Sequence, residues 1–279
     1  MAAHTAVGYV LAVGVSGALN GAHLGATLVA IFLWVVLLNG GTLAINSAFD
    51  RDEGDIGYLK APPPVPRHLA SVAFGLMALG QVVALRLPVG FALAYAICFA
   101  MSLAYSVPPL RLKAVAGVDW VINMWGFGAF TPYAGYAATG LPLDRAHTLV
   151  LLAFCPLFAC LYPLTQLYQL EEDRRRGDRT LALILGMRRS LIVACVAAGL
   201  AFLTLVLAGL EADWGWDQSG ILRWAGVALA AIAWGRVLGP WLVRHRTMTP
   251  DQHQAGMYAA LGAWALTDVV VILGWGVYS

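Results

Sequence analysis

Two short stretches of the chain concentrate side chains that bind divalent metals and phosphates. Their oxygen-bearing members are Asn46, Asp50, Asp52, Asp55, Gln166, Gln169, Glu172 and Asp173. Each stretch follows a long apolar run, and eight of the 15 Asp and Glu residues lie in or directly beside them. Carboxylates at the end of a membrane-length apolar segment cost free energy unless a cation meets them, and Mg²⁺ prefers such oxygen ligands. We therefore expect the two stretches to meet in one metal-dependent site.

Helical spacing supports this interpretation within each stretch. Asn46 and Asp50 are four residues apart, and Gln166, Gln169 and Asp173 follow an i, i+3, i+7 pattern. Residues so spaced share one face of a helix. The first apolar run with its acids is similar to the later run with its own, which suggests a repeated arrangement of acid-capped helices without a detectable sequence repeat.

Basic residues near the acids extend the chemistry from metal binding to phosphate binding. Lys60 stands before three consecutive prolines, which favour an extended, stiff loop, and Arg111 and Lys113 follow another apolar run. Carboxylate-bound Mg²⁺ with Arg and Lys close by suits a polyphosphate. If that phosphate is a leaving group, the site stabilises the charge that develops on it, and the carbon left behind becomes a cation.

The elements that position these residues are predicted to be membrane-spanning helices. The chain has 279 residues, of which 60% are hydrophobic and only 11% charged, and this composition excludes an ordinary soluble protein. Its apolar stretches are about 20 residues long, enough to cross a bilayer core of about 30 Å. We count nine, at approximately 5–22, 25–47, 69–87, 88–107, 116–138, 147–169, 190–210, 221–243 and 257–278. The expected fold is an all-α, polytopic membrane domain spanning residues 1–279.

The distribution of Lys and Arg predicts how this domain lies in the membrane. Thirteen of the 17 lie in loops after even-numbered segments: Arg51, Lys60, Arg67, Arg111, Lys113, Arg174, Arg175, Arg176, Arg179, Arg188, Arg189, Arg244 and Arg246. The opposite side has only Arg86, Arg145 and Arg223. By the positive-inside rule, both acidic stretches face the cytoplasm across the cell inner membrane. We expect no cleaved signal peptide, and the net charge of +2 gives no reason to expect a nucleic-acid partner.

The fifth apolar segment has the residues expected of a pocket wall. Asp119 and Asn123 stand four apart near its start, which indicates a face toward a polar cavity. Its aromatic residues include Trp125, Phe127, Phe130 and Tyr133. Aromatic faces stabilise a carbocation, so one or more of these residues are expected beside the reacting carbon, where they would also limit the length of a bound chain. Packing against lipid or neighbouring helices is the alternative for each.

Three features in order along the chain resemble the UbiA superfamily of intramembrane prenyltransferases. They are Asn46-x3-Asp50, Tyr105-Ser106-x-Pro108-Pro109-x-Arg111-x-Lys113 and Asp173-x3-Gly177-x2-Thr180-Leu181. The resemblance implies nine helices around a central cavity, Mg²⁺ ions under the acidic stretches, and a prenyl diphosphate donor of C10–C20 or longer. It also implies a lipophilic acceptor, aromatic in many such enzymes, with membrane lipid as the surroundings.

The resemblance also suggests a role for each candidate residue. The catalytic candidates are Asn46, Asp50 and Asp173. The substrate-binding candidates are Lys60, Tyr105, Arg111, Lys113, Asn123, Gln166 and Gln169. The candidate metal ligands are Asp50, Asp52, Asp55, Gln169, Glu172 and Asp173.

The chain departs from the family pattern at three positions. Ser47 stands where the family usually has Asp, Gly54 replaces the last acid of the first motif, and Gln169 replaces an acid of the second. A glutamine binds Mg²⁺ through its carbonyl oxygen but brings no charge, so we expect an altered metal site. Two other functions stay open. A terpene cyclase of the same fold would need no acceptor, and a transporter would place its acids near the bilayer midplane.

Overall fold

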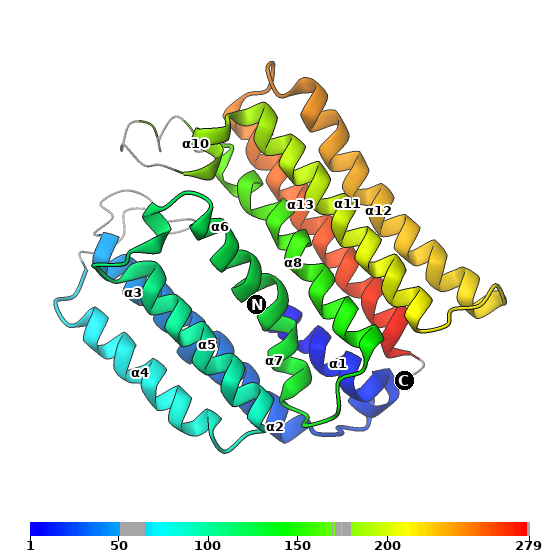
Figure 1. Ribbon diagram of the computed structural model, residues 1–279, viewed down its shortest axis with the longest axis horizontal. Helices are drawn as coiled ribbons and strands as arrows, with labels where there is room; N and C mark the ends of the chain where they lie inside the picture. Colours follow the sequence, from blue (N-terminus) through cyan, green and yellow to red (C-terminus); the bar gives the residue numbers. More distant parts are fainter. Residues whose placement is uncertain (51–64, 169, 171–173, 175–179, 278–279) are drawn as a thin grey trace.

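The computed structural model describes residues 1–50, 65–168, 170, 174 and 180–277, and it leaves the side chain of Asp50 outside this part. All regular structure in these ranges is helical (Figure 1), which confirms the predicted all-α fold. The N-terminal elements are α1 (Ala2–Leu19), α2 (Leu24–Ile31), η1 (Phe32–Asn39), α3 (Gly40–Asp50), α4 (Leu69–Ala84), α5 (Val89–Ser106), η2 (Leu112–Ala114), α6 (Val118–Asn123), η3 (Met124–Phe130) and α7 (Thr131–Ala137). The C-terminal elements are α8 (Arg145–Gln166), α10 (Leu181–Leu185), α11 (Met187–Glu211), α12 (Gln218–Arg244), α13 (Pro250–Val271) and η4 (Ile272–Gly276).

The helices agree with the nine apolar segments of the sequence. Among the described residues, seven helices are long and apolar enough to cross a membrane: Ala2–Leu19, Leu24–Phe49, Val89–Ser106, Arg145–Gln166, Met187–Glu211, Gln218–Arg244 and Pro250–Gly276. The predicted third segment is the shorter apolar helix Leu69–Ala84, and the fifth is the unbroken run of α6, η3 and α7. A bilayer leaves backbone groups no water to bond with, so apolar segments of this length become helices.

Stretches of π-helix interrupt two of the helical runs and end a third. They are η1 between α2 and α3, η3 between α6 and α7, and η4 after α13. A π-helix widens the turn and alters the pairing of backbone carbonyls, and it occurs frequently at functional sites. Two of the three, η1 and η3, belong to the helices that surround the cavity described below.

Small residues bring some helices unusually close. Helix α1 crosses α7 at Gly8 and Gly135, where a Cβ on Gly8 would collide with the carbonyl of Pro132 and one on Gly135 with that of Thr5. In the same way, a Cβ on Gly128 would lie 2.6 Å from the carbonyl oxygen of Phe154 on α8. Close backbone approach at glycine is a common means of helix association in membranes. The first crossing joins α1 to α7 within the N-terminal elements, and the approach at Gly128 joins η3 to the C-terminal helix α8.

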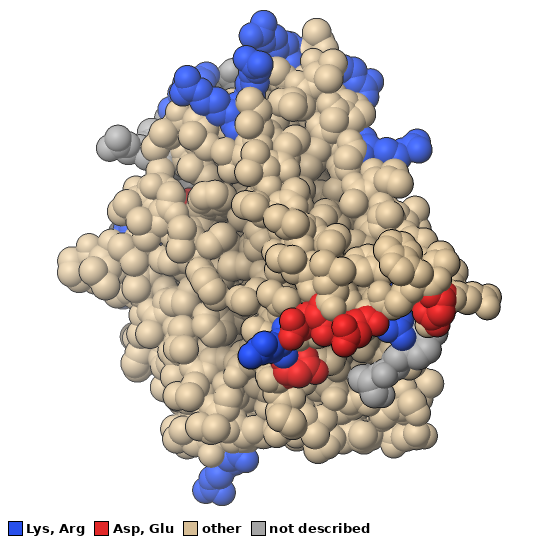
Figure 2. Space-filling view, turned by 45° about the vertical axis from the view of Figure 1, so that its right-hand side comes forward, with Lys and Arg blue, Asp and Glu red and all other residues tan. Residues whose placement is uncertain are grey.

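Charged side chains separate toward the two ends of the bundle. Figure 2 shows a group of acidic side chains near one end, whereas most of the Lys and Arg visible on this face lie toward the other. The exposed acids of the α7–α8 and α11–α12 connections are Asp144, Glu211, Asp213 and Asp217. The end with α10 and the ends of α3 and α5 is the basic one.

Candidate active site

A cavity of about 180 Å³ opens among η1–α3, α5 and α6–η3. Its walls are Met1, Trp34, Leu38, Asn39, Thr42, Leu43, Asn46, Cys98, Met101, Ser102, Tyr105, Ile122, Asn123, Gly126 and Phe127. Asn46, Tyr105 and Asn123 line the cavity toward the basic end of these helices, and Trp34, Leu38 and Phe127 lie deeper along the same helices. The cavity therefore suits an amphiphile with a polar head and an apolar chain.

Asn46 is the point at which two of the sequence motifs meet. Its side-chain oxygen accepts a hydrogen bond from Lys113 Nζ at 2.7 Å and another from the hydroxyl of Ser106 at 3.3 Å. Ser106 is fully buried, so its contact with Asn46 is shielded from solvent. The structure thus brings a lysine ammonium to the polar end of the cavity, beside the helix that ends at Asp50.

Local sequence explains how Lys113 reaches this position. Helix α5 ends at Ser106 because Val107 is extended before Pro108, as the residue before a proline prefers. The chain then turns at Arg111, which adopts a left-handed conformation (φ 36°), and continues into η2. This turn directs Lys113 back toward α3 and leaves Arg111 exposed at the same end.

Tyr105 lines the cavity in contact with a buried carboxylate network. Asp119 is only 3% exposed, and its carboxylate accepts hydrogen bonds from the hydroxyl of Tyr162 at 2.9 Å and the backbone N–H of Gly117 at 2.8 Å. The hydroxyl of Tyr162 also interacts with Tyr105. Asn123 lines the cavity and donates to the backbone carbonyl of Asp119 at 2.8 Å. The predicted polar face of this helix thus has two parts: Asn123 borders the cavity, and Asp119 supports Tyr105 through Tyr162.

Three further polar residues line the cavity that the sequence analysis did not identify. They are Asn39, Thr42 and Ser102, and the hydroxyl oxygens of Thr42 and Ser102 are 2.8 Å apart. Their spacing in the sequence indicates that they share helix faces with Asn46 and Tyr105. Residues 39, 42 and 46 follow an i, i+3, i+7 pattern, and residues 98, 102 and 105 follow an i, i+4, i+7 pattern. These residues lie on the same helix faces as Asn46 and Tyr105 but further from the helix ends.

The second acidic stretch begins at the end of α8. Gln166 is half-buried, and its side-chain oxygen accepts a hydrogen bond from the backbone N–H of Ala182 at 3.1 Å. Thr180 caps α10 by accepting from the N–H of Leu183 at 3.4 Å. Gln166 therefore joins α8 to α10 in this structure, and its role as a substrate ligand stays a prediction.

Most of the predicted metal ligands lie outside the described residues. These are Asp52, Asp55, Gln169, Glu172 and Asp173, together with the side chain of Asp50 and, among the predicted phosphate ligands, Lys60. Among the side chains that the structure describes, no group of three His, Cys, Asp or Glu could hold a metal ion. The described groups at the polar end of the cavity are neutral or cationic and suit a phosphate, while the donor set of the two acidic stretches fits Mg²⁺.

The aromatic residues of the fifth segment divide between two hollows. Phe127 lines the cavity and stacks on Phe158 of α8 with ring centres 5.3 Å apart. Trp125, Phe130 and Tyr133 line a second hollow of about 350 Å³ among α5, η3–α7 and α8. Its wall on α5 includes Gly90, Leu93, Ala94 and Ile97, which continue the face that carries Cys98 and Met101 in the first cavity. Along α5, the second hollow begins where the cavity ends.

The sequence and the fold are similar to those of known membrane enzymes. The sequence matches the UbiA prenyltransferase family over residues 2–262. A digeranylgeranylglyceryl phosphate synthase of Natronomonas pharaonis is 31% identical over 245 residues, which cover 85% of this chain and 83% of that enzyme.

Solved structures share the architecture at lower sequence identity. A UbiA homologue from Archaeoglobus fulgidus, bound to DMAPP and Mg²⁺, has a TM-score of 0.66 at 18% identity and covers 97% of this chain and 94% of its own. A structure concerned with a digeranylgeranylglyceryl phosphate synthase in membranes has a TM-score of 0.71 at 14% identity and covers 98% and 92%. The shared fold extends over nearly the whole of each chain.

Proposed function

Because the chain belongs to the UbiA prenyltransferase family, we propose that it transfers the prenyl group of an isoprenoid diphosphate to a lipophilic acceptor inside the membrane. The observation that carries this proposal is the cavity, polar at Asn46 and Tyr105 and apolar at Trp34 and Phe127. Such a gradient matches a donor with a diphosphate head and a hydrocarbon chain.

The polar end of the cavity has the residues to hold the diphosphate. Lys113 already lies 2.7 Å from Asn46, and Arg111 is exposed nearby on the same turn. Lys60 is the third basic candidate from the sequence. Their ammonium and guanidinium groups would neutralise the phosphate oxygens and stabilise the charge of the departing diphosphate.

A magnesium-dependent reaction agrees with the donor set of the acidic stretches. Asp50, Asp52, Asp55, Gln169, Glu172 and Asp173 would hold Mg²⁺, which supplies further positive charge to the leaving group. The Archaeoglobus fulgidus homologues with DMAPP and with GPP contain Mg²⁺ as well.

The apolar end of the cavity would protect the reactive carbon. Trp34 is 2% exposed, and Phe127 presents its ring from η3. Apolar walls exclude water, which would otherwise capture a carbocation, and aromatic faces attract positive charge. The chain's own side chains thus provide both binding and protection.

Two classes of acceptor fit a prenyltransferase of this kind. The family resemblance suggested an aromatic acceptor, whereas the Natronomonas pharaonis relative is named for a product with two geranylgeranyl chains on glyceryl phosphate. Since that relative is 31% identical over most of both chains, we favour a C20 donor and a glyceryl phosphate lipid that carries one geranylgeranyl chain.

The reaction is proposed to take place at the cytoplasmic face of the cell inner membrane. By the sequence pattern, 13 of the 17 Lys and Arg residues fall on one side of the membrane, and among them Arg111 and Lys113 follow α5 at the polar end of the cavity. The positive-inside rule assigns that end to the cytoplasm.

Product analysis with purified protein tests the proposed reaction. The protein is incubated with Mg²⁺ and C10, C15 or C20 diphosphates, with geranylgeranylglyceryl phosphate, with a phenolic lipid, or with no acceptor. We expect a coupled product only with an acceptor, most rapidly from the C20 donor and the glyceryl phosphate lipid, and loss of product with EDTA. Cyclic hydrocarbons formed without any acceptor would instead identify a terpene cyclase of this fold.

A further inference from the structure

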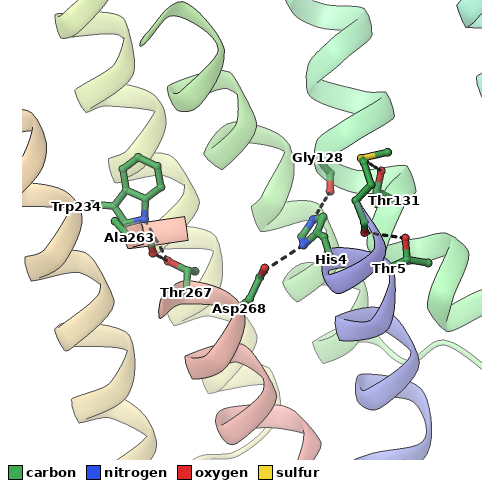
Figure 3. A network of polar contacts seen from close by, with 9 residues as sticks. His4, Thr5, Gly128, Thr131, Trp234, Ala263, Thr267 and Asp268 are labelled. Carbon is green, nitrogen blue, oxygen red and sulfur yellow. Dashed lines mark hydrogen bonds and ion pairs between the residues drawn. The ribbon is translucent and has the colours of Figure 1, made fainter. Parts of the chain in front are cut away.

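A histidine and an aspartate pair inside the membrane, outside the lining of the cavity. His4 on α1 is 6% exposed, and its Nδ1 lies 3.1 Å from a carboxylate oxygen of Asp268 on α13. Its Nε2 lies 3.4 Å from the backbone carbonyl oxygen of Gly128 on η3. Figure 3 shows the imidazole between the two helices, with one nitrogen directed at each. Burying ionisable side chains inside a membrane costs free energy, and residues of this kind commonly have a function.

Both ring nitrogens of His4 face oxygen atoms, and these two contacts determine the hydrogen bonds that the His4–Asp268 pair can form. A carbonyl accepts only, so the contact with Gly128 is a hydrogen bond in the forms of His4 that carry a proton on Nε2. The proton between Nδ1 and Asp268 is then shared within the pair, as an imidazolium with a carboxylate or a neutral ring with a carboxylic acid. In either form, Asp268 fixes the orientation of the ring and leaves Nε2–H directed at the backbone of η3.

Aromatic packing leaves the imidazole little freedom to turn away. The ring of Phe154 meets it edge-on with centres 4.5 Å apart, and the ring of Trp264 does so at 5.1 Å. The backbone of Phe154 also touches Gly128, where a side chain would not fit. His4, Gly128 and α8 are therefore packed as one unit.

The carbonyl that His4 contacts belongs to the π-helical stretch η3. Within η3, the carbonyl of Gly126 accepts from the Thr131 hydroxyl at 2.9 Å, as that of Gly128 accepts from His4. Both contacts join a side chain outside η3 to a backbone carbonyl within it, so they help to hold the backbone of η3 in its π-helical form.

The opposite side of the same short helix forms the wall of the cavity. Gly126 and Phe127 line it, and Trp34, another lining residue, donates to the Thr131 hydroxyl at 3.3 Å. The π-helix and the α-helix differ in the number of residues per turn. A change of η3 from one form to the other would therefore rotate the residues before it, about the helix axis, relative to the residues after it. The position of the Phe127 ring therefore depends on the contacts that hold the backbone of η3.

We propose that His4 and Asp268 are positioning residues, which hold η3 in its π-helical form and so determine how long a prenyl chain the cavity accepts. This inference rests on the proposed function, because it takes the apolar end of the cavity as the place of the prenyl chain. His4 does not line the cavity and acts through Gly128 and its neighbour Phe127.

The same helix offers a matched control. Thr267 precedes Asp268 on α13, is also buried, and accepts a hydrogen bond from Trp234 of α12 at 3.1 Å. Figure 3 shows this pair on the other side of α13, away from η3. Thr267→Val thus removes a buried membrane hydrogen bond at nearly the same depth without touching the cavity wall.

The test measures binding of non-hydrolysable C10, C15 and C20 prenyl thiolodiphosphates with Mg²⁺ by calorimetry. His4→Leu and Asp268→Leu are expected to change the ratio of C20 to C10 affinity by about three- to tenfold, the effect of one buried hydrogen bond, while affinity for inorganic diphosphate stays the same. Thr267→Val should keep the wild-type ratio. Asp268→Asn should restore it, because the introduced amide donates to Nδ1 and still leaves Nε2–H for Gly128.

The design separates this inference from the proposed reaction. Analogue binding is measured without an acceptor, so the result does not depend on whether or to what the prenyl group is transferred. If His4→Leu fails to fold, Asp268→Leu provides the same test with the imidazole in place. An unchanged C20 to C10 ratio in a folded leucine variant would overturn the proposal, as would an equal change in Thr267→Val.

Discussion

The N-terminal and C-terminal halves of the bundle differ in how they are packed. Among the residues that the structure describes, those that line the cavity lie between Met1 and Phe127. In the C-terminal half, α11 packs on α8 through a row of buried alanines: Ala194, Ala197, Ala198 and Ala201. Small residues at regular spacing let helices approach closely and leave little space between them. The first half therefore provides the walls of the cavity, and the second half provides a compact support.

The same contrast limits the similarity between the two acid-capped helices. The first, α2–η1–α3, contains a π-helical stretch and lines the cavity from Trp34 to Asn46. The second, α8, contributes no lining residue among those described and carries interior prolines at Pro156 and Pro163. The two helices are alike in their acidic ends but differ along their membrane-spanning parts. The second is expected to contribute to the reaction mainly through the residues that follow it.

Replacing the acids contributed by each half should have the largest effect. Asp50→Ala and Asp173→Ala should each lower turnover by about 10²- to 10³-fold, because each removes a charged ligand from the metal and diphosphate site. Steady-state kinetics with a saturating donor measures the loss, and the exposed Glu211→Gln at the opposite end is the control. Near-normal turnover in Asp173→Ala would confine the chemistry to the first half, contrary to the proposed site.

Removing the lysine at the polar end of the cavity should have an intermediate effect. Lys113→Met should raise the KM for the donor by about 10- to 100-fold, since it removes a charged hydrogen-bond donor from the diphosphate. Arg189→Ala removes an exposed charge from the basic end in the second half and should leave KM within about twofold. Similar losses in both variants would mean that general surface charge, and not a defined contact, attracts the donor.

Replacing an aromatic residue of the cavity wall by a smaller one should have the smallest effect. It should change the preference for donor chain length and not the turnover. Phe127→Leu should increase use of the C20 donor relative to C10 by about tenfold, because it opens the apolar end of the cavity. Phe158→Leu, which changes its stacking partner on α8, should alter the ratio less. Product profiles from C10, C15 and C20 donors give the comparison.

The other aromatics extend this test to the second hollow. Trp125, Phe130 and Tyr133 line it and would contact only a chain that passes beyond the first cavity. Their replacement by leucine should therefore affect the C20 donor more than C10. If none of the four substitutions changes chain-length preference or product distribution, this helix is scaffold, and the pocket wall must be sought on other helices.

The sequence alone predicted the membrane fold and the polar end of the cavity. Nine apolar segments were recognisable because a bilayer requires long, internally hydrogen-bonded helices, and their ends agree with the structure to within a few residues for most segments. Asn46, Arg111 and Lys113 were recognisable because polar residues at the ends of such segments stand out by contrast. Asn39, Thr42 and Ser102 gave a weaker signal, since their hydroxyl and amide groups lie within apolar runs where helix packing also accommodates them.

Only the tertiary structure decided which side chains meet across the bundle. The bond from Tyr162 to Asp119 and the contact of His4 with Asp268 join helices far apart in the sequence. The position of Asp268 in the sequence does not indicate that its partner is His4. Helical periodicity determines the face of a helix on which a residue lies, whereas the rotation and crossing of each helix depend on packing against all its neighbours. The partners of a buried polar group are therefore defined only when the whole bundle is assembled.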